Sequence, residues 1–173
     1  ADYNRELELT KEYNGRQLLE LLQNADDATS SEVLIDWNKN NLKLTISNKG
    51  EPFEAGGIKS LMLANLSTKT KISYIGNKGL GFRSILNWAE QINISSNGCT
   101  ISFSEEIAKN VFNNQLDLSN DKKNLLRNDR NLSAETIPFP VLAIPKIKET
   151  DNLSDWATSI EITYRKEFET DIE

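Results

Sequence analysis

The sequence predicts a fold with helices on one face of a mixed, mostly antiparallel sheet. Three observations predict it: an amphipathic helical pattern at 13–28, two paired strand patterns joined by turn residues, and an alternating strand at 159–164. Helices and strands of this kind bury their apolar faces against one another in two layers. The chain has 173 residues, which is enough for one domain with an ordinary core.

The first helix has two distinct faces. At about 100° per residue, its apolar residues share one broad face, namely Leu18, Leu21, Leu22, Ala25 and Ala28. A polar stripe follows another face because positions four and seven apart stack along a helix; it comprises Glu20, Asn24 and Asp27, flanked by Gln23. This stripe faces either water or a pocket.

Two short segments then read as a β-hairpin, at 32–37 and 42–47. Val33, Ile35 and Trp37 share one face, which we expect to be buried, while Leu34 lies on the other. The sequence motif from Asn48 to Phe53 breaks the second strand. It is either a simple turn or a pocket in which a polar side chain reads a base edge and Gly50 leaves room for an aromatic ring.

The middle of the chain predicts a short helix at 58–65, a basic loop at 67–74 and a helix at 82–90. A second hairpin follows, with strands at 91–95 and 100–104 joined by an Asn-Gly turn. Residues 105–150 read as a variable insert, with some strand near 141–144. The chain begins at Ala1 and not at Met, and we expect it to be a fragment of a larger protein.

Composition excludes several kinds of chemistry. The chain has no histidine and only one cysteine, Cys99, so His-dependent triads, His-ligated zinc and an internal disulfide are excluded. The formal net charge is −6, which argues against a surface that coats nucleic acid. No apolar run approaches the length of a membrane span, and we expect a cytoplasmic protein.

A glycine-rich segment lies between the basic loop and the second predicted helix. Gly76, Gly79 and Gly81 precede Phe82, and glycines before a helix allow backbone N–H groups to approach phosphate closely. The order differs from the dinucleotide-binding fingerprint, and Phe82 stands where a P-loop requires lysine. The alternative is a tight turn without a ligand.

Four motifs together resemble the GHKL ATPases, a superfamily that includes gyrase B, Hsp90, histidine kinases and MutL. The stretch from Glu20 to Ala28 looks like their N-box, and the stretch from Asn48 to Phe53 looks like the first glycine box. The segment 75–84 looks like the second glycine box, and 157–160 resembles the Gly-Thr box, with Ala157 in place of glycine. The residues of these motifs most resemble those of the Hsp90-like branch, which includes sacsin-type and related prokaryotic ATP-binding domains. The resemblance implies an α/β (α+β) two-layer sandwich, the Bergerat fold, for residues 1–173, with a lid at about 61–75.

The resemblance also implies roles for individual residues. Glu20 matches the general base that polarises the attacking water, and Asn24 matches the ligand of Mg²⁺. Asn48 stands at the adenine-reading position, which is usually Asp. The residues implied in ATP binding are Asn24, Asp27, Asn48, Gly50, Pro52, Phe53, Lys69, Gly76, Lys78, Gly79, Leu80, Gly81, Phe82 and Thr158. Lys71 is a further lid lysine that could reach phosphate; solvated loop lysines are an equal alternative.

The expected function is therefore Mg²⁺-dependent ATP binding with slow hydrolysis, as the nucleotide switch of a larger Hsp90-like protein. The expected partners are ATP or ADP, further domains of the same polypeptide and an ATP-dependent second copy, with neither membrane nor a nucleic-acid surface. A DNA-processing or defence-system ATPase of MutL or gyrase type is one alternative, and a binding module without turnover is another. A histidine kinase is disfavoured because the chain has no histidine.

Overall fold

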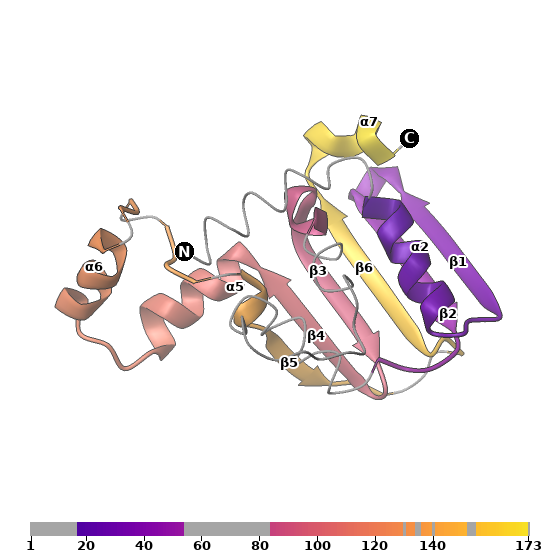
Figure 1. Ribbon diagram of the computed structural model, residues 1–173, viewed down its shortest axis with the longest axis horizontal. Coiled ribbons are helices and arrows are strands. Elements are labelled where there is room, and N and C mark those ends of the chain that lie inside the picture. The colour runs from indigo at the N-terminus through magenta and orange to yellow at the C-terminus, as the bar shows by residue number, and fades with distance from the viewer. Residues whose placement is uncertain are drawn as a thin grey trace.

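A computed structural model of the chain describes residues 17–53, 84–129, 131–133, 136–139, 141–151 and 155–172. Within these ranges, six antiparallel strands form one sheet in the order β1-β2-β6-β3-β4-β5 (Figure 1). The strands are β1 (Glu32–Asn38), β2 (Lys43–Lys49), β3 (Ala89–Ser96), β4 (Cys99–Ser104), β5 (Lys146–Glu149) and β6 (Thr158–Tyr164). The helices are α2 (Gln17–Asp27), α5 (Glu105–Asn110), α6 (Asn120–Asn128) and α7 (Glu169–Ile172). This architecture confirms the predicted combination of helices with a mostly antiparallel sheet.

The strand β6 organises the sheet because it pairs with both β2 and β3. Ile160 lies opposite Ile46 on one side and Ile94 on the other. Residues directly opposite one another in an antiparallel pair share a face, so the three isoleucines form a row across three strands. All three are buried, and the predicted alternating strand at 159–164 is confirmed.

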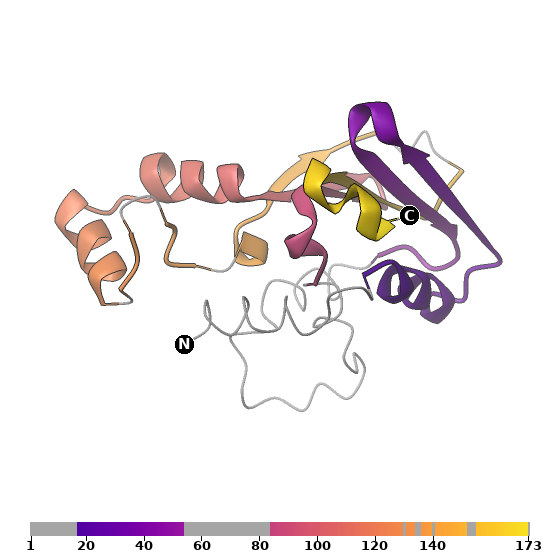
Figure 2. The ribbon, with the colours of Figure 1, turned by 90° about the horizontal axis from the view of Figure 1, so that it is seen from above.

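Helix α2 covers this apolar face of the sheet. Leu21 and Ala25 are buried, and Leu21 belongs to the same core cluster as Leu44 and Ile46. Figure 2 shows α2 on one side of the sheet, while α5 and α6 extend beyond its β4–β5 edge. The predicted apolar face of the first helix is therefore confirmed.

The opposite face of the sheet is polar. Ser47 and Ser159 hydroxyls lie 2.6 Å apart, and Lys43 forms an ion pair of 2.9 Å with Glu161. Asn93 donates a hydrogen bond of 3.0 Å to the same glutamate. The inner strands β2 and β6 thus alternate between a buried apolar side and a more polar side. None of the described helices has the length and apolar character that a membrane crossing requires.

Shortening a buried side chain of the inner strand β6 should destabilise the fold measurably. Ile162 is 0% exposed on β6, and removing one buried methylene by Ile162→Val should cost about 1 kcal/mol of unfolding free energy. The matched control is Ile147→Val, because Ile147 on β5 is 60% exposed. Urea unfolding of both variants checks this, and an equal loss of stability would contradict the assignment of β6 to the core.

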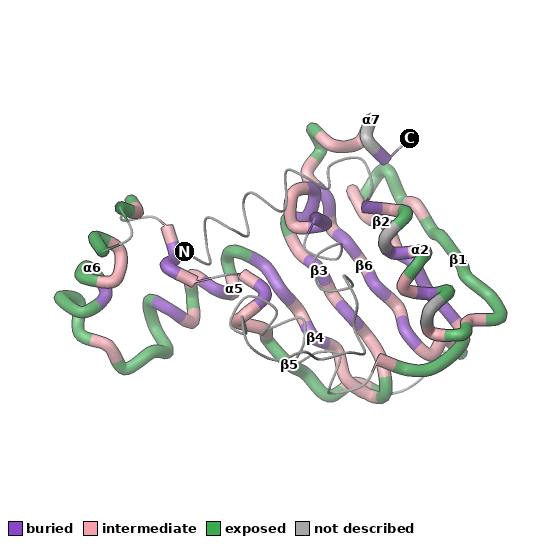
Figure 3. The backbone as a smooth tube through the Cα atoms, viewed as in Figure 1, coloured by how far each residue is buried: buried purple, intermediate pink, exposed green. Residues whose placement is uncertain are grey.

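The prediction that the first hairpin buries the inner face of its first strand is wrong. Val33 and Ile35 are 39% and 45% exposed, and only Trp37 on that face is half-buried. The reason is position: β1 is an edge strand whose only described neighbour is β2. Figure 3 shows the exposed edge beside the buried stripes of the inner strands. The hairpin itself is confirmed, with a 3₁₀ turn at Lys39–Asn41.

The second hairpin is confirmed at its turn. Asn97 and Gly98 both have positive φ, at 51° and 74°, as a two-residue turn between right-twisted strands requires. The predicted helix at 82–90 extends too far: of its described residues only Ser84 is α-helical, a 3₁₀ turn follows at Ile85–Asn87, and β3 already begins at Ala89. Tertiary pairing of β3 with β6 overrides the local helical pattern.

The first part of the insert is helical. Ser104 caps α5 by accepting a hydrogen bond of 3.0 Å from the Ile107 amide, and a π-helical turn at Val111–Gln115 follows. Ala108, Phe112 and Ile137 form a second small apolar cluster. The strand predicted near 141–144 is wrong, because Val141–Ala143 is a 3₁₀ turn and β5 begins after Pro145. Proline lacks the N–H that a strand ladder needs.

Candidate functional site

The predicted N-box lies on a helix that the core holds in place. Helix α2 spans Gln17–Asp27, so Glu20, Asn24 and Asp27 occupy successive turns of its backbone. Asn24 is half-buried. The side chains of Glu20 and Asp27 lie outside the part of the chain that the structure describes. The helix places the candidate base one turn before the candidate metal ligand.

The predicted base-reading residues meet at one end of the sheet. Asn48 on β2 and Thr158 on β6 are direct register partners. Both are buried, at 6% and 4% exposure, and they lie on the face that α2 covers. The Ala157 amide donates a hydrogen bond of 3.0 Å to the Asn48 carbonyl. Two motifs that are far apart in the sequence are therefore neighbours.

Ser96 joins these two motifs, although the sequence analysis did not single it out. Its hydroxyl donates to the Ala157 carbonyl at 2.7 Å and accepts from the Phe53 amide at 2.8 Å. The Thr158 hydroxyl lies 3.0 Å from it. Because the single hydrogen of Ser96 is already donated, Thr158 is the donor in this contact and keeps lone pairs free as acceptors. Only the register of β3 against β6, which the sequence does not state, could have identified this serine.

Gly50 brings the first glycine box against the end of α2. Its φ is +144°, and a Cβ at this position would lie 2.4 Å from the Ala28 carbonyl oxygen. The adjacent Glu51 amide donates a hydrogen bond of 3.0 Å to that same oxygen. Only glycine fits this approach. Pro52 is exposed, while Phe53 is half-buried against the main core.

One polar atom at this end of the sheet is buried without a partner. Asn48 Nδ2 forms no hydrogen bond with any residue that the structure describes. A buried N–H without an acceptor is costly. Asn48 is the register partner of Thr158, so the unpartnered amide nitrogen and the Thr158 hydroxyl belong to the same end of the sheet.

Helix α2 carries Asn24, the residue that the resemblance assigns to Mg²⁺. The described residues hold no group of three or more metal-binding side chains. Any metal held by them would therefore need most of its ligands from a bound molecule or water. Mg²⁺ binds in that way, with few protein oxygens plus phosphates and waters. The half-buried amide of Asn24 fits such a role.

Lys49 follows Asn48 but is engaged elsewhere. It donates a hydrogen bond to the Glu32 carboxylate at 2.8 Å, and this bond and the charge of Glu32 raise the pKa of Lys49. Its ammonium also lies 5.3 Å from the Trp156 ring centre. Lys49 is therefore held near the polar face of the sheet.

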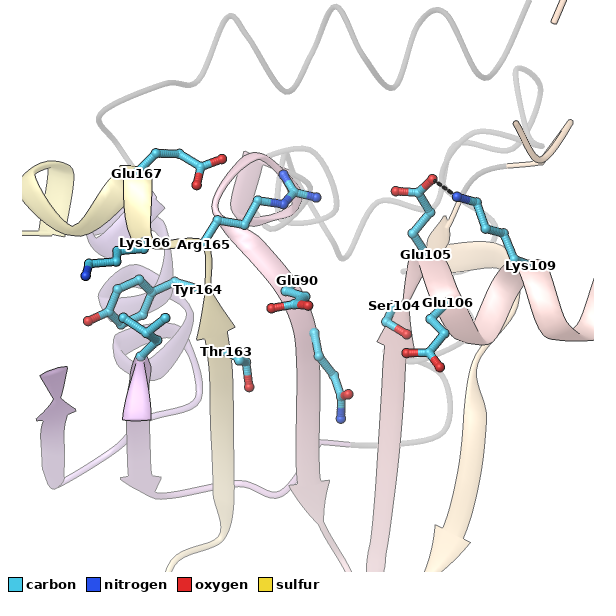
Figure 4. Close-up of a pocket in the computed structure, with 12 residues that line it drawn as sticks. Glu90, Ser104, Glu105, Glu106, Lys109, Thr163, Tyr164, Arg165, Lys166 and Glu167 are labelled. Carbon is cyan, nitrogen blue, oxygen red and sulfur yellow. Dashed lines mark ion pairs between the residues drawn. The ribbon is translucent and has the colours of Figure 1, made fainter. Parts of the chain in front are cut away.

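A cavity of about 790 Å³ opens at the other end of the sheet (Figure 4). It lies where β3 begins and where β4 and β6 end. Its lining carries both charges, including Glu90, Glu105, Lys109 and Arg165; Glu105 and Lys109 form an ion pair of 2.9 Å. None of the motif residues lines this cavity, so it is distinct from the predicted site.

Several predicted site residues lie outside the described part of the chain. They are Lys69, Lys71, Gly76, Lys78, Gly79, Leu80, Gly81 and Phe82, together with the predicted helix at 58–65 and the lid at 61–75. Their predicted roles therefore remain predictions. Comparison with known proteins finds no family model that matches the chain and no similar protein among those with curated descriptions.

Proposed function

We propose that this chain is a GHKL-type domain with a Bergerat fold that binds Mg²⁺-ATP and hydrolyses it slowly. One observation carries the proposal: Asn48 and Thr158 are buried register partners at one sheet end, and Gly50 joins that end to α2. The N-box on α2, the first glycine box with Asn48 and Gly50, and the Gly-Thr box with Thr158 are three of the four motifs whose resemblance implies nucleotide binding. Their convergence is what a shared ligand site requires.

The roles of the residues follow from their chemistry. Asn48 and Thr158 bind the base, and Gly50 and Phe53 shape the space around it. Asn24 provides one amide oxygen to Mg²⁺, which neutralises phosphate charge when it is bound. Glu20 accepts a proton from the attacking water. The glycine segment 76–81 offers backbone N–H groups to the phosphates.

The biological role that we propose is a nucleotide switch. ATP binding closes a lid over the site, which excludes water and can limit turnover. In this proposal the lid comprises residues 61–75 and carries Lys69. Closure is transmitted to further domains of the same polypeptide or to a second copy of the chain. Hydrolysis by the isolated chain is accordingly expected to be slow.

Calorimetric titration tests the binding part of this proposal. ATP and ADP, each with and without Mg²⁺, should give saturable binding that Mg²⁺ strengthens for ATP. Thr158→Val removes a hydroxyl at the site and should weaken ATP binding about tenfold. Ser159→Ala is the matched control, because Ser159 faces the polar side of the sheet beside Ser47 and should bind as the wild type does. Absence of binding by the folded wild type at millimolar nucleotide would overturn the proposal.

A further inference from the structure

The Asn48 side chain is the least satisfied polar group at the proposed site. It is 6% exposed, and its Nδ2 has no hydrogen-bond acceptor among the described residues. A buried amide in this state gains more from a ligand acceptor than an exposed amide would, because water does not compete for it. The group therefore points to a ligand that brings an acceptor to the end of β2.

The amide also has a property that a carboxylate lacks. It presents one donor and one acceptor side by side, and a half-turn of the amide exchanges them. A 6-amino purine presents a donor at position 6 beside an acceptor at N1, whereas a 6-oxo purine presents an acceptor beside a donor. An asparagine matches both edges with two hydrogen bonds, while an ionised aspartate offers acceptors only.

No hydrogen bond from Nδ2 to a described residue fixes which of these two orientations the Asn48 amide adopts. The Thr158 hydroxyl, on the register partner of Asn48, lies 3.0 Å from the Ser96 hydroxyl; as the donor in that contact it keeps its oxygen lone pairs as acceptors whichever way the amide turns.

We propose that Asn48 makes the site accept 6-oxo purine nucleotides as well as ATP. This inference rests on the proposed nucleotide-binding function and specifies its substrate class. Inosine triphosphate is the cleanest probe, because it differs from ATP only at position 6 and in the proton on N1. The wild type should bind the two nucleotides with dissociation constants within about threefold of each other, a difference of less than one hydrogen bond.

The test compares Mg²⁺-ATP and Mg²⁺-ITP binding to three proteins by calorimetry at pH 8. Asn48→Asp should weaken both nucleotides by about tenfold, because an ionised carboxylate can donate neither to N1 of ATP nor to the 6-oxo group of ITP. Ser47→Ala, one residue away on the opposite face, should keep both wild-type affinities. If circular dichroism shows that Asn48→Asp does not fold, Asn48→Ala replaces it and should weaken both nucleotides by the same factor.

The outcomes separate this inference from the proposed function. If neither nucleotide binds the wild type, the proposed function fails and the inference fails with it. If ATP binds and ITP binds more than about thirtyfold more weakly, nucleotide binding stands and the inference is overturned. If both bind equally and Asn48→Asp weakens neither, Asn48 does not read the base and the inference is overturned. Equal binding by the wild type that weakens for both nucleotides in Asn48→Asp, but not in Ser47→Ala, supports the inference.

Discussion

Replacing Glu20 by glutamine should leave Mg²⁺-ATP binding intact and lower the rate of phosphate release at least about a hundredfold. Glutamine has nearly the shape of glutamate but cannot accept a proton from the attacking water. The substitution lies on α2, which Leu21 and Ala25 anchor in the core, so the fold should survive. Calorimetry measures the binding, and a coupled phosphate assay measures the release.

The matched control is Glu106→Gln, which makes the same change of charge on the exposed start of α5, beside the cavity at the other end of the sheet. It should hydrolyse ATP at the wild-type rate. If Glu20→Gln and Glu106→Gln released phosphate equally fast, Glu20 would have no part in catalysis. Loss of binding in Glu20→Gln alone would instead assign this residue to the binding site.

Gly50→Ala should destabilise the folded chain by about 3 kcal/mol and weaken ATP binding at the same time. The new Cβ would lie 2.4 Å from the Ala28 carbonyl oxygen, which is backbone and cannot swing aside, and φ is +144°. The end of α2 must therefore move away from β2. That movement also breaks the hydrogen bond that Glu51 donates to Ala28.

Gly98→Ala isolates the steric part of this effect. Gly98 also has a positive φ, at 74°, but its nearest added contact would be an ordinary 3.7 Å to Thr150. The substitution should cost only about 1 kcal/mol from backbone strain and leave ATP binding unchanged. Urea unfolding with and without nucleotide measures both variants. Equal destabilisation would show that the contact with Ala28 is not a close one.

The parts of the fold that the sequence predicts correctly are those that local chemistry determines. The spacing of the apolar residues in α2 is enough to predict which face of the helix is buried. The Asn97-Gly98 turn fixes the register of its hairpin. The alternation of Ile160 and Ile162 marks an inner strand. In these segments the pattern of apolar residues and the tertiary environment agree.

The parts that it predicts wrongly depend on neighbours. Val33 and Ile35 have the pattern of a buried strand face, but β1 is an edge strand of the sheet and both side chains are exposed. The apolar stretch at 141–144 has strand-like residues, yet the strand forms beyond Pro145 from Lys146, Ile147 and Lys148. Propensity cannot say which strand becomes an edge, because edge position depends on the order of the whole sheet.

In the candidate site, too, some residues could be predicted from the sequence and others could not. Asn48, Gly50 and Thr158 stand in motifs, and the structure brings the first and third into register. The role of Ser96 depends on three hydrogen bonds to segments distant in the chain, and a serine before a turn has no distinctive signature. The resemblance identifies which residue types gather around a nucleotide, but only the sheet shows which neighbours hold them.

The central position of β6 has a consequence for how the protein folds during its synthesis. It pairs with β2 and β3 on either side, yet it is the last of the six strands to be made. Until residues 158–164 leave the ribosome, the hairpins β1–β2 and β3–β4 lack the strand that pairs with both of them, and the edges of β2 and β3 stay unpaired. Pairings between distant segments form slowly and expose such edges to aggregation. Closure of the described sheet therefore depends on the strand that is made last, and the inner edges of β2 and β3 stay unpaired until β6 is available.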